Sequence, residues 1–272
     1  MSKAETRQDA ILALIGERGF VATEELVRRF KVTPQTIRRD LNVLSETNRI
    51  ARFHGGAGQS SLHQPYSDRA RSGLAAKRQI AAAAAALIPD GASLFLNIGT
   101  TTEAVAEALL EHSDLYAVTN NLHVAQILSR NSSFTIMLSG GQVRNHDGGL
   151  IGAEAVDFVN KFRTDYGIIG ISAVDADGSL LDFDPREVKI AQAIMRNANH
   201  VVLVTEEQKF GRRATTHLGH LRDLDTLVTD GPIDPAHAAM LREGNVRHVI
   251  ARDEAAAKNK TATKNRSERN RS

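Results

Sequence analysis

The sequence predicts an α/β protein with two domains of unequal size. Residues 1–57 contain three short stretches with helical spacing of apolar residues, followed by a short strand. Residues 74–252 alternate short apolar runs with helical segments, which is typical of a mainly parallel sheet covered by helices on both faces. With 272 residues, 42% of them hydrophobic, the chain can form one large core and one small one.

Charge is distributed unevenly along the chain. Residues 1–57 hold ten Lys/Arg and seven Asp/Glu, whereas residues 58–252 hold 18 and 22. A basic head on an acidic body indicates that only the head meets a polyanion such as DNA. An excess of three positive charges is modest, and it is also compatible with scatter.

Composition excludes several classes of protein. The chain has no Cys, which excludes disulfides and thiolate metal sites. The N-terminus is polar and lacks the apolar core of a signal peptide. The longest apolar run, Ile80–Ile88, is too short to span a bilayer. We therefore expect a cytoplasmic protein with no metal and no cofactor.

The first two elements of the head are predicted helices. Arg7–Glu17 has a buried apolar side, and Gly19 is a natural stop. Thr23 is predicted to cap a second helix, whose first turn holds Glu24 and Glu25, as the helix dipole favours. A short turn at Lys31 and Val32 then leads into a third helix.

The third stretch, Val32–Leu44, predicts a helix that starts at a defined point. Thr33 can cap its first turn, and Pro34 suits the first helical position. Ile37, Leu41 and Leu44 form one apolar stripe. The side chains that project away from this stripe or flank it are Gln35, Thr36, Arg38, Arg39 and Asn42. Such a helix can enter a DNA major groove, although an ordinary amphipathic surface helix has the same pattern.

The remainder of the head predicts a wing. Ile50, Arg52 and His54 alternate with Ala51 and Phe53 before the Gly55-Gly56 turn. Arg52 and His54 would then lie where they can contact phosphates beside the groove. A plain hairpin without a role in binding is the alternative.

The body is predicted to begin after a linker at 58–73, which is rich in Ser, Gln, Gly and charge and contains Pro65. Leu74–Ile88 is a predicted helix. The expected strands are Ser93–Ile98, Leu115–Thr119, Phe134–Ser139, Tyr166–Ile171, His200–Thr205, Thr226–Thr229 and Val246–Ala251. The expected helices between them are Glu103–Glu111, Leu122–Arg130, Ala153–Lys161, Arg186–Asn197 and Pro235–Glu243.

Polar residues gather where these strands end, which is where ligands bind in parallel sheets. The first strand runs into Gly99, Thr100, Thr101 and Thr102, which open a helix whose N-terminus favours an anion. Further strand ends carry Asn120 with Asn121, Gly140 with Gly141 and Arg144, and Lys209. Singly each motif is most simply a helix start or a bend. Together they predict a phosphate-binding site.

Val32–Asn42, followed by Arg52–Ala57, resembles the N-terminal winged helix-turn-helix of the DeoR family of bacterial transcriptional regulators. The resemblance implies that Gln35, Thr36 and Arg39 read base edges of operator DNA. It implies that Arg38 and the wing residues hold phosphates. Asp40 lies near the buried edge of the helix, so we expect it to pair with a basic neighbour.

The resemblance extends to the sugar-phosphate sensor domain of that family, which is related to ribose-5-phosphate isomerase and glucosamine-6-phosphate deaminase. It is carried by Ile98–Thr101, Val118–Asn121, Ser139–Arg144, Gly148–Gly152, Gly170–Ser172 and Lys209–Gly211. It implies a repressor that acts as a dimer or higher oligomer and is released from DNA by a phosphorylated effector. Asp177–Val188 and Gly152–Phe158 resemble the glycerol 3-phosphate branch of the family, which implies sn-glycerol 3-phosphate as effector and control of glycerol metabolism genes.

Two departures from the family pattern leave the sugar side of the ligand open. Asn97 stands where many members have Asp, and Glu206–Lys209 stands where Asp-x-Ser-Lys is usual. A hexose or ketose phosphate is therefore an alternative effector.

A second alternative is an isomerase or deaminase fused to a DNA-binding head. Asp182, Asp184, Glu187 and Lys189 could supply the charge that such an enzyme needs. We expect a regulator and not an enzyme. The basic residues 253–272 have no apolar periodicity and are expected to be a disordered tail that could add DNA affinity.

Overall fold

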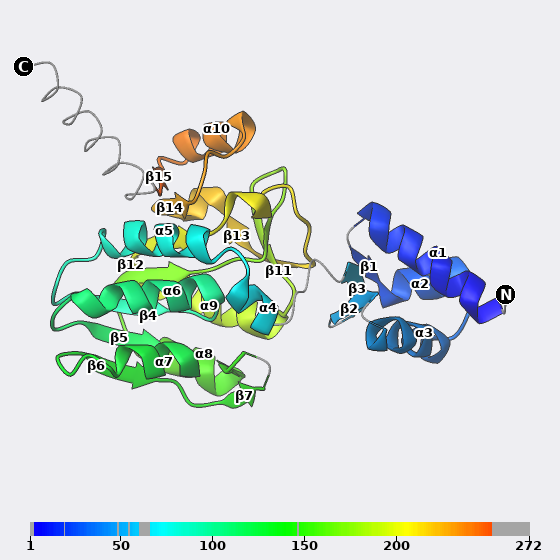
Figure 1. Ribbon diagram of the computed structural model, residues 1–272, viewed down its shortest axis with the longest axis horizontal. Helices are drawn as coiled ribbons and strands as arrows, with labels where there is room; N and C mark the ends of the chain where they lie inside the picture. The colour runs from blue at the N-terminus through cyan, green and yellow to red at the C-terminus, as the bar shows by residue number, and fades with distance from the viewer. Residues whose placement is uncertain are drawn as a thin grey trace, which may run out of the picture.

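The computed structural model describes residues 3–18, 20–47, 49–53, 55–59, 66–145 and 147–251. Two units are visible, a small head of helices and short strands and a larger body built on a sheet (Figure 1). Gly19, His54 and the predicted tail lie outside the described residues. In the part of the chain that is described, no helix has the length and apolar character needed to cross a membrane.

The head consists of three helices and a three-stranded antiparallel sheet. The elements are α1 (Lys3–Arg18), β1 (Phe20–Ala22), α2 (Thr23–Phe30), α3 (Pro34–Glu46), β2 (Ile50–Phe53) and β3 (Gly56–Gln59). The predicted strand forms as β2 and pairs with β3 in a hairpin, and its role as a wing stays a prediction; β1 pairs with β3 on the side away from β2. The strand β1 was not predicted. Gly56 permits it, because a Cβ there would lie 2.5 Å from the carbonyl oxygen of Val21.

One predicted cap in the head is wrong. The helix α2 starts at Thr23, preceded by Ala22, and no side chain caps its first turn. The backbone N–H of Thr23 instead donates to the carbonyl of Gly55, at a distance of 2.7 Å. This bond joins the start of α2 to the turn between β2 and β3, and it does not replace the missing cap, which would have accepted from an N–H group further into the helix.

The body is built on seven parallel strands, in the order β15-β14-β12-β9-β4-β5-β6. These are β4 (Ser93–Leu96), β5 (Tyr116–Thr119), β6 (Thr135–Leu138), β9 (Thr164–Ile169), β12 (Ala198–Val204), β14 (Thr226–Thr229) and β15 (Arg247–Ile250). Each corresponds to one of the seven predicted strands. The apolar side chains of the five inner strands are mostly buried on both faces, which is why those runs are nearly continuous, whereas the edge strands β6 and β15 are partly exposed.

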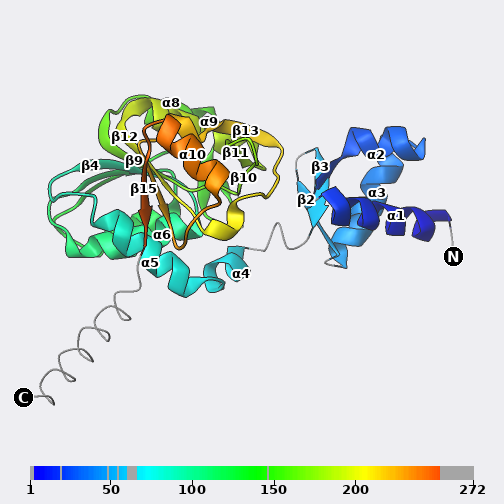
Figure 2. The same cartoon turned by 90° about the horizontal axis from the view of Figure 1, so that it is seen from above.

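Helices cover both faces of the sheet (Figure 2). One core lies under α5 (Leu74–Ala85), α6 (Thr100–Ala108) and α7 (Leu122–Leu128). The other lies under α8 (Ala153–Val159), α9 (Pro185–Asn197) and α10 (Pro235–Glu243). Short 3₁₀ turns occur at η2 (Leu109–Glu111), η3 (Glu207–Lys209) and η4 (Leu221–Asp223).

Two small antiparallel sheets were not predicted. One pairs β7 (Gln142–Arg144) with β8 (Gly149–Ile151). The other has the order β10-β11-β13, formed by β10 (Ala173–Val174), β11 (Ser179–Asp182) and β13 (Thr216–His220). Both follow carboxyl ends of the main sheet, so they add residues around its ligand-binding edge.

The strand order reverses beside β4. The chain proceeds from β4 through β5 to β6 in one direction, then returns to β9 on the other side of β4. A crevice outside the strand ends forms at such a reversal, and ligands of open α/β sheets bind there. The ends of β4 and β9 are therefore the place to look for a site.

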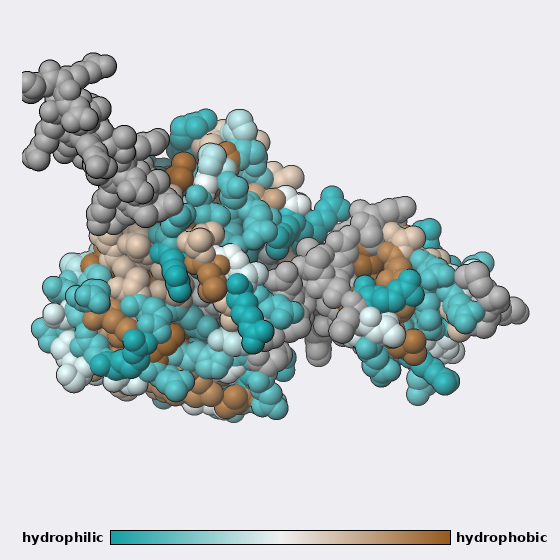
Figure 3. Space-filling model, in the orientation of Figure 1, coloured by the Kyte–Doolittle hydropathy of each residue, from teal (hydrophilic) through white to brown (hydrophobic). Residues whose placement is uncertain are grey.

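Part of the predicted linker at 58–73 is helical, because α4 (Tyr66–Arg71) forms within it. This helix contacts α6 and lies at the side of the body from which the chain continues to the head (Figures 1 and 2). The head also contacts the body, because Phe20 packs against Phe183, against which Ala214 packs as well. Figure 3 shows that the viewed face of the body is mostly hydrophilic, with small separate apolar areas.

Candidate functional site

The helix α3 presents the polar surface predicted for it. Thr33 caps its start, with its Oγ1 accepting from the backbone N–H of Thr36 at 3.2 Å, and Pro34 is the first helical residue. The stripe of Ile37, Leu41 and Leu44 is buried. Among the side chains predicted to contact DNA, Gln35, Arg38 and Arg39 are exposed and Thr36 is half-buried.

Asp40 pairs with a basic neighbour, as expected. The Nε of Arg7 in α1 donates to Asp40 Oδ2 at 2.6 Å, and the Nε2 of Gln8 donates to Oδ1 at 3.1 Å. The hydrogen bond to Asp40 raises the pKa of Arg7. This buried ion pair fixes α3 against α1, so the polar face of α3 is held at a defined angle.

The wing residues are only partly covered by the structure. Arg52 lies in β2 opposite Ala57 of β3, and the contacts of its side chain are not described. His54 lies outside the described residues. Their contact with DNA phosphates stays a prediction.

In the body, the loop after β4 has the geometry of an anion-binding helix start. Gly99 has φ +147°, a conformation that favours glycine, and no side chain caps α6 behind it. The backbone N–H groups of the first turn are thus left for a ligand. Thr102 is fully buried, and its Oγ1 lies 2.8 Å and 2.7 Å from the carbonyl oxygens of Asn97 and Gly99. Its hydroxyl shapes the loop, whereas Thr100 and Thr101 open the helix beside it.

The two asparagines after β5 have different roles. Asn121 caps α7, because its Oδ1 accepts from the N–H of His123 at 2.9 Å while its Nδ2 donates to Glu103 Oε1 at 3.1 Å. Asn120 donates from Nδ2 to the carbonyl of Leu150 at 3.2 Å. The Oδ1 of Asn120 is buried and has no hydrogen-bond partner among the described residues.

Arg144 is held by three carboxylates. Its Nε and Nη2 donate to Asp147 at 2.9 Å and 2.5 Å, its Nη2 also donates to Glu187 at 2.7 Å, and its Nη1 donates to Asp184 at 3.1 Å. These partners raise the pKa of Arg144 against the effect of burial. Gly140 and Gly141 lie exposed in the turn that leads to Arg144. With its donors engaged by these carboxylates, Arg144 mainly stabilises the fold at this place.

The carboxylates beside Arg144 differ in their protonation. Burial is the largest cause that raises the pKa of Glu187 to about 7, and the charge of Asp182 adds to it. Burial raises the pKa of Asp182 as well. Hydrogen bonds from Arg186 lower the pKa of Asp184 to about 2, overcoming its burial. The cluster therefore carries less negative charge near neutral pH than its count of carboxylates indicates.

Lys209 is the second predicted cation of the site, and it is far less neutralised. Its Nζ donates to the carbonyl of Ile171, at the end of β9, at 2.8 Å. Burial lowers its pKa to about 8, the charge of Glu206 opposes that shift, and the charge of Arg69 adds to it. An ammonium whose charge is costly in the empty site gains most from an incoming anion.

Unpartnered polar atoms gather at the same edge of the sheet. Four buried side-chain oxygens or hydroxyls follow carboxyl ends of the parallel strands and have no hydrogen-bond partner among the described residues, namely Asn97 Oδ1, Asn120 Oδ1, Ser139 Oγ and Thr205 Oγ1. Buried polar groups are normally paired, so unpaired groups along one edge of the sheet indicate where a polar ligand can bind, although these four are spread from β6 to β12. We call the region of these four residues, the Gly99–Thr102 loop and Lys209 the strand-end site.

Residues 73–231 match the family described as "DeoR C terminal sensor domain", and residues 7–61 match the "DeoR-like helix-turn-helix domain". The chain belongs to the DeoR family. It is 50% identical to the glycerol-3-phosphate regulon repressor of Escherichia coli K12, covering 85% of this chain and 92% of that protein. It is 46% identical to the glycerol-3-phosphate regulon repressor of Haemophilus influenzae, covering 91% and 97%.

A solved structure of ribose 5-phosphate isomerase A from Methanocaldococcus jannaschii is matched with a TM-score of 0.38. Its sequence identity is 15%, over 51% of this chain and 55% of that chain. The family of the chain rests on the sequence matches alone. They make it a DeoR-type repressor, with a helix-turn-helix for DNA and a sensor domain for a small molecule.

Sequence reasoning missed two cations at or just before the start of the sensor domain. Arg69 lies in α4 and Lys77 in α5, within or next to the stretch that we predicted as a linker. Lys77 is buried, and its Nζ donates to the carbonyls of Arg69 and Ser72. The signal was present, because Tyr66–Ser72 contains no Pro or Gly and can continue a helix.

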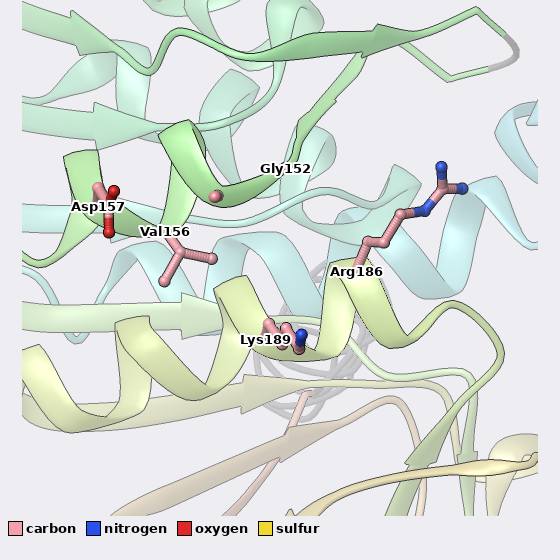
Figure 4. A pocket seen from close by; sticks show the side chains of 6 residues that line it. Gly152, Val156, Asp157, Arg186 and Lys189 are labelled. Atoms are coloured by element: carbon pink, nitrogen blue, oxygen red, sulfur yellow. The ribbon is translucent and has the colours of Figure 1, made fainter.

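A separate hollow of about 330 Å³ lies between α8 and α9 of the sensor domain (Figure 4). It is lined by Gly152, Ala153, Val156, Asp157, Arg186 and Lys189. Lys189 therefore lies at this hollow and not beside Lys209. None of the unpartnered buried atoms of the described residues belongs to its lining.

Proposed function

We propose that this DeoR-family repressor binds operator DNA through α3 and the wing, and leaves it when a phosphorylated metabolite occupies the strand-end site. The effector that we propose first is sn-glycerol 3-phosphate, with glycerol metabolism genes as targets. The observation that carries the proposal is the similarity, over nearly the whole chain, to two proteins named as glycerol-3-phosphate regulon repressors.

The chemistry of the strand-end site supports a small phosphomonoester with free hydroxyls. Lys209 and the uncapped start of α6 suit a phosphate dianion. The amide oxygens of Asn97 and Asn120 are acceptors that lack a donor among the described residues. Hydroxyl groups of a glycerol backbone are the donors that such oxygens require.

The DNA contacts divide into two kinds. Gln35, Thr36 and Arg39 are proposed to contact base edges, and each good bidentate base contact contributes roughly 1–3 kcal/mol of discrimination. Arg38, Arg52 and His54 are proposed to hold phosphates, which makes binding dependent on salt. Two copies of the head, supplied by a homo-oligomer, would occupy two operator half-sites.

Release requires that DNA and effector bind with different strength to two states of the protein. A coupling free energy of about 1–3 kcal/mol between the two sites is typical of such regulators. The experiment follows from this. A high-affinity operator is first selected from a random DNA library, and its binding to the full chain is measured by fluorescence anisotropy with and without each of several metabolites.

The set of metabolites decides the effector. It contains sn-glycerol 3-phosphate, fructose 6-phosphate, ribose 5-phosphate, glycerol and inorganic phosphate. Release by sn-glycerol 3-phosphate alone is the expected result. Release by another sugar phosphate keeps the mechanism and replaces the ligand, an outcome for which Asn97 and Glu206 leave room. Release by none of them contradicts the proposal.

The enzymatic alternative finds less support in the geometry. Asp182, Asp184 and Glu187 would have to act as a base, and two of them are bound to Arg144. An absence of turnover of fructose 6-phosphate and ribose 5-phosphate by the full chain is the expected result. Turnover that fails in Asp182→Asn would contradict it.

A further inference from the structure

The helix α4 connects the strand-end site to the chain that leads to the head, and it is anchored at both of its ends. At its start, the hydroxyl of Tyr66 donates to Glu103 Oε2 at 2.7 Å and lies 2.7 Å from the Nδ1 of His123. At its end, Lys77 reaches from α5 to the carbonyls of Arg69 and Ser72. A six-residue helix at an interdomain connection thus has two polar anchors on the sensor domain.

The position of α4 spans the carboxyl edge of the sheet. Glu103 belongs to α6, which starts behind β4, and His123 belongs to α7, which starts behind β5. After α4, Gly73 lies beside Glu206, which follows β12, because a Cβ at Gly73 would lie 2.7 Å from Glu206 Oε2. The helix therefore extends from the β4 and β5 side of the strand-end site to its β12 side.

In α4, Arg69 carries a positive charge next to this site, and nearby carboxylates neutralise that charge only weakly. Its Nε is buried and has no hydrogen-bond partner among the described residues. Its Nη2 lies 4.0 Å from Asp147 Oδ2, an oxygen that already accepts from Arg144 at 2.5 Å. A guanidinium carries five N–H donors, so Arg69 has donors left for an incoming oxyanion.

Arg69 is also close to the other cations of the site. Its positive charge is among the causes that lower the pKa of Lys77 and of Lys209, behind burial as the largest cause in both. Three basic groups thus share one region, whereas Arg144 is occupied by carboxylates. Cations that repel one another in the empty site are stabilised together by a bound dianion.

We propose that Arg69 binds the phosphate group of the effector, so that the linker helix itself is part of the ligand site. This inference rests on the proposed function. It adds that a bound effector contacts α4 directly, and α4 is the first helix of the body after the connection to the head. Ligand contact fixes α4 against Lys209 and the start of α6. The orientation of the head then depends on whether the phosphate is present.

A second contact places the head near the same charged cluster. Phe20 of the winged helix packs against Phe183, whose chain neighbours are Asp182 and Asp184. Asp184 holds Arg144, and Asp182 adds to the charge around Lys209. A shift of α4 relative to this cluster would therefore change the packing of Phe20 on Phe183 as well as the position of the linker.

The test measures effector affinity in the full chain without DNA. Isothermal titration calorimetry with sn-glycerol 3-phosphate is performed on wild type, Arg69→Ala, Arg69→Lys and Arg71→Ala. Loss of hydrogen bonds to a charged group predicts that Arg69→Ala weakens binding about 10- to 150-fold. Arg69→Lys keeps the charge and should recover part of that loss. Arg71→Ala is the matched control, because Arg71 is exposed on the same helix, and it should bind as wild type does.

Two further measurements separate a ligand role from a structural one. The melting temperature without ligand and the affinity for the selected operator should be unchanged in Arg69→Ala. Hydrogen exchange over residues 66–72 should slow on adding sn-glycerol 3-phosphate to wild type, and not in Arg69→Ala. Equal affinity of Arg69→Ala and wild type, or a lowered melting temperature that alone accounts for the loss, would overturn the assignment of Arg69.

Failure of the proposed function gives a different result. In that case the wild type itself binds none of the phosphorylated metabolites, which overturns the proposed function and the role of Arg69 together. Binding to wild type with no effect of Arg69→Ala overturns the inference about α4 only.

Discussion

The head and the body both place cations where a phosphate is expected, but they do so in opposite ways. The head shows Arg38 and Arg39 on an exposed helix face. The body holds Arg144 among three carboxylates and lowers the pKa of the buried Lys209 to about 8. A long polyanion can be met by charges on an exposed surface, whereas a small dianion requires charges fixed before it arrives.

The helices α3 and α6, which start at these two surfaces, differ in whether a side chain caps their first turn. The side chain of Thr33 closes the start of α3, so the helix is complete without a ligand. The start of α6 at Gly99 has no side-chain cap and leaves its N–H groups open. The start of α3 is thus closed by a side chain of the protein itself, whereas the start of α6 has N–H groups that a bound anion would satisfy.

The largest effect that would sharpen this comparison is expected at Arg144. Removing one partner of a buried ion cluster leaves the others uncompensated, so Arg144→Ala should lower the free energy of unfolding by about 3–5 kcal/mol. Chemical denaturation of the full chain measures it. Arg186→Ala is the matched control, because Arg186 also pairs with Asp184 but is 49% exposed, and an exposed pair contributes about 0–1 kcal/mol. An Arg144→Ala protein of normal stability that no longer binds the effector would show that Arg144 is a ligand and not a structural cation.

In the head, Arg39→Ala should remove operator preference without unfolding α3. The ratio of affinities for the selected operator and for a scrambled sequence should fall about 5- to 150-fold, which corresponds to one lost base contact. Fluorescence anisotropy measures both affinities. Arg38→Ala serves for comparison, since a lost phosphate contact weakens both sequences alike and leaves the ratio unchanged. An unchanged ratio in Arg39→Ala would refute the proposed division of roles on α3.

Lys209 predicts a pH dependence in the body that the head lacks. Because the pKa of Lys209 is about 8 in the empty site, effector binding above that pH has to take up a proton, and affinity should fall towards tenfold per pH unit. Calorimetric titration between pH 7 and 10 tests this. In Lys209→Arg the guanidinium stays charged, so its affinity should fall less over this range than that of the wild type; burial also lowers the pKa of Lys77, which would account for a remaining fall. A wild-type affinity that is flat to pH 10 would place the phosphate elsewhere.

The same group affects stability with a definite sign. The pKa of Lys209 in the folded state lies below its ordinary value of 10.5, so the folded chain binds fewer protons than the unfolded chain between about pH 8 and 10.5. The contribution of Lys209 to the free energy of unfolding therefore rises as the pH rises through that window. Replacement by Met should remove this rise, as measured by denaturation at several pH values.

The smallest effect is expected at the start of α3. Thr33→Ala removes the cap and should destabilise the head by about 1 kcal/mol, whereas Thr33→Ser should retain most of the stability. Thermal unfolding followed by circular dichroism compares the two. Equal loss in both variants would mean that the hydroxyl is not what closes the helix.

Regular parts of the fold followed from local patterns. All seven strands of the main sheet were predicted, because each is a short apolar run between polar turns, and the five inner strands are buried on both faces. The bounds of α10 were predicted without error, since Asp234 and Pro235 define its start. The pairing of Asp40 also followed, because helical spacing puts it at the buried edge of α3.

What was missed depends on contacts distant in sequence. The strand β1 has three residues and exists because it pairs with β3. The strand β13 pairs with β11 across more than thirty residues, whereas β10 and β11 pair locally and were missed because both are short. Arg69 was overlooked because its helix has six residues, is rich in charge, and is held in place by Tyr66 and Lys77 across the chain.

The anchoring of α4 has a consequence for building hybrid repressors. A head taken from another DeoR protein and joined before Tyr66 would retain both polar anchors and Arg69, and should respond to this chain's own metabolite. A junction placed after Gly73 would import a foreign linker helix together with the foreign head. Such a hybrid should bind its operator normally but should not be released by the effector, because its α4 would come from the protein that supplied the head and not from the protein that supplied the ligand site.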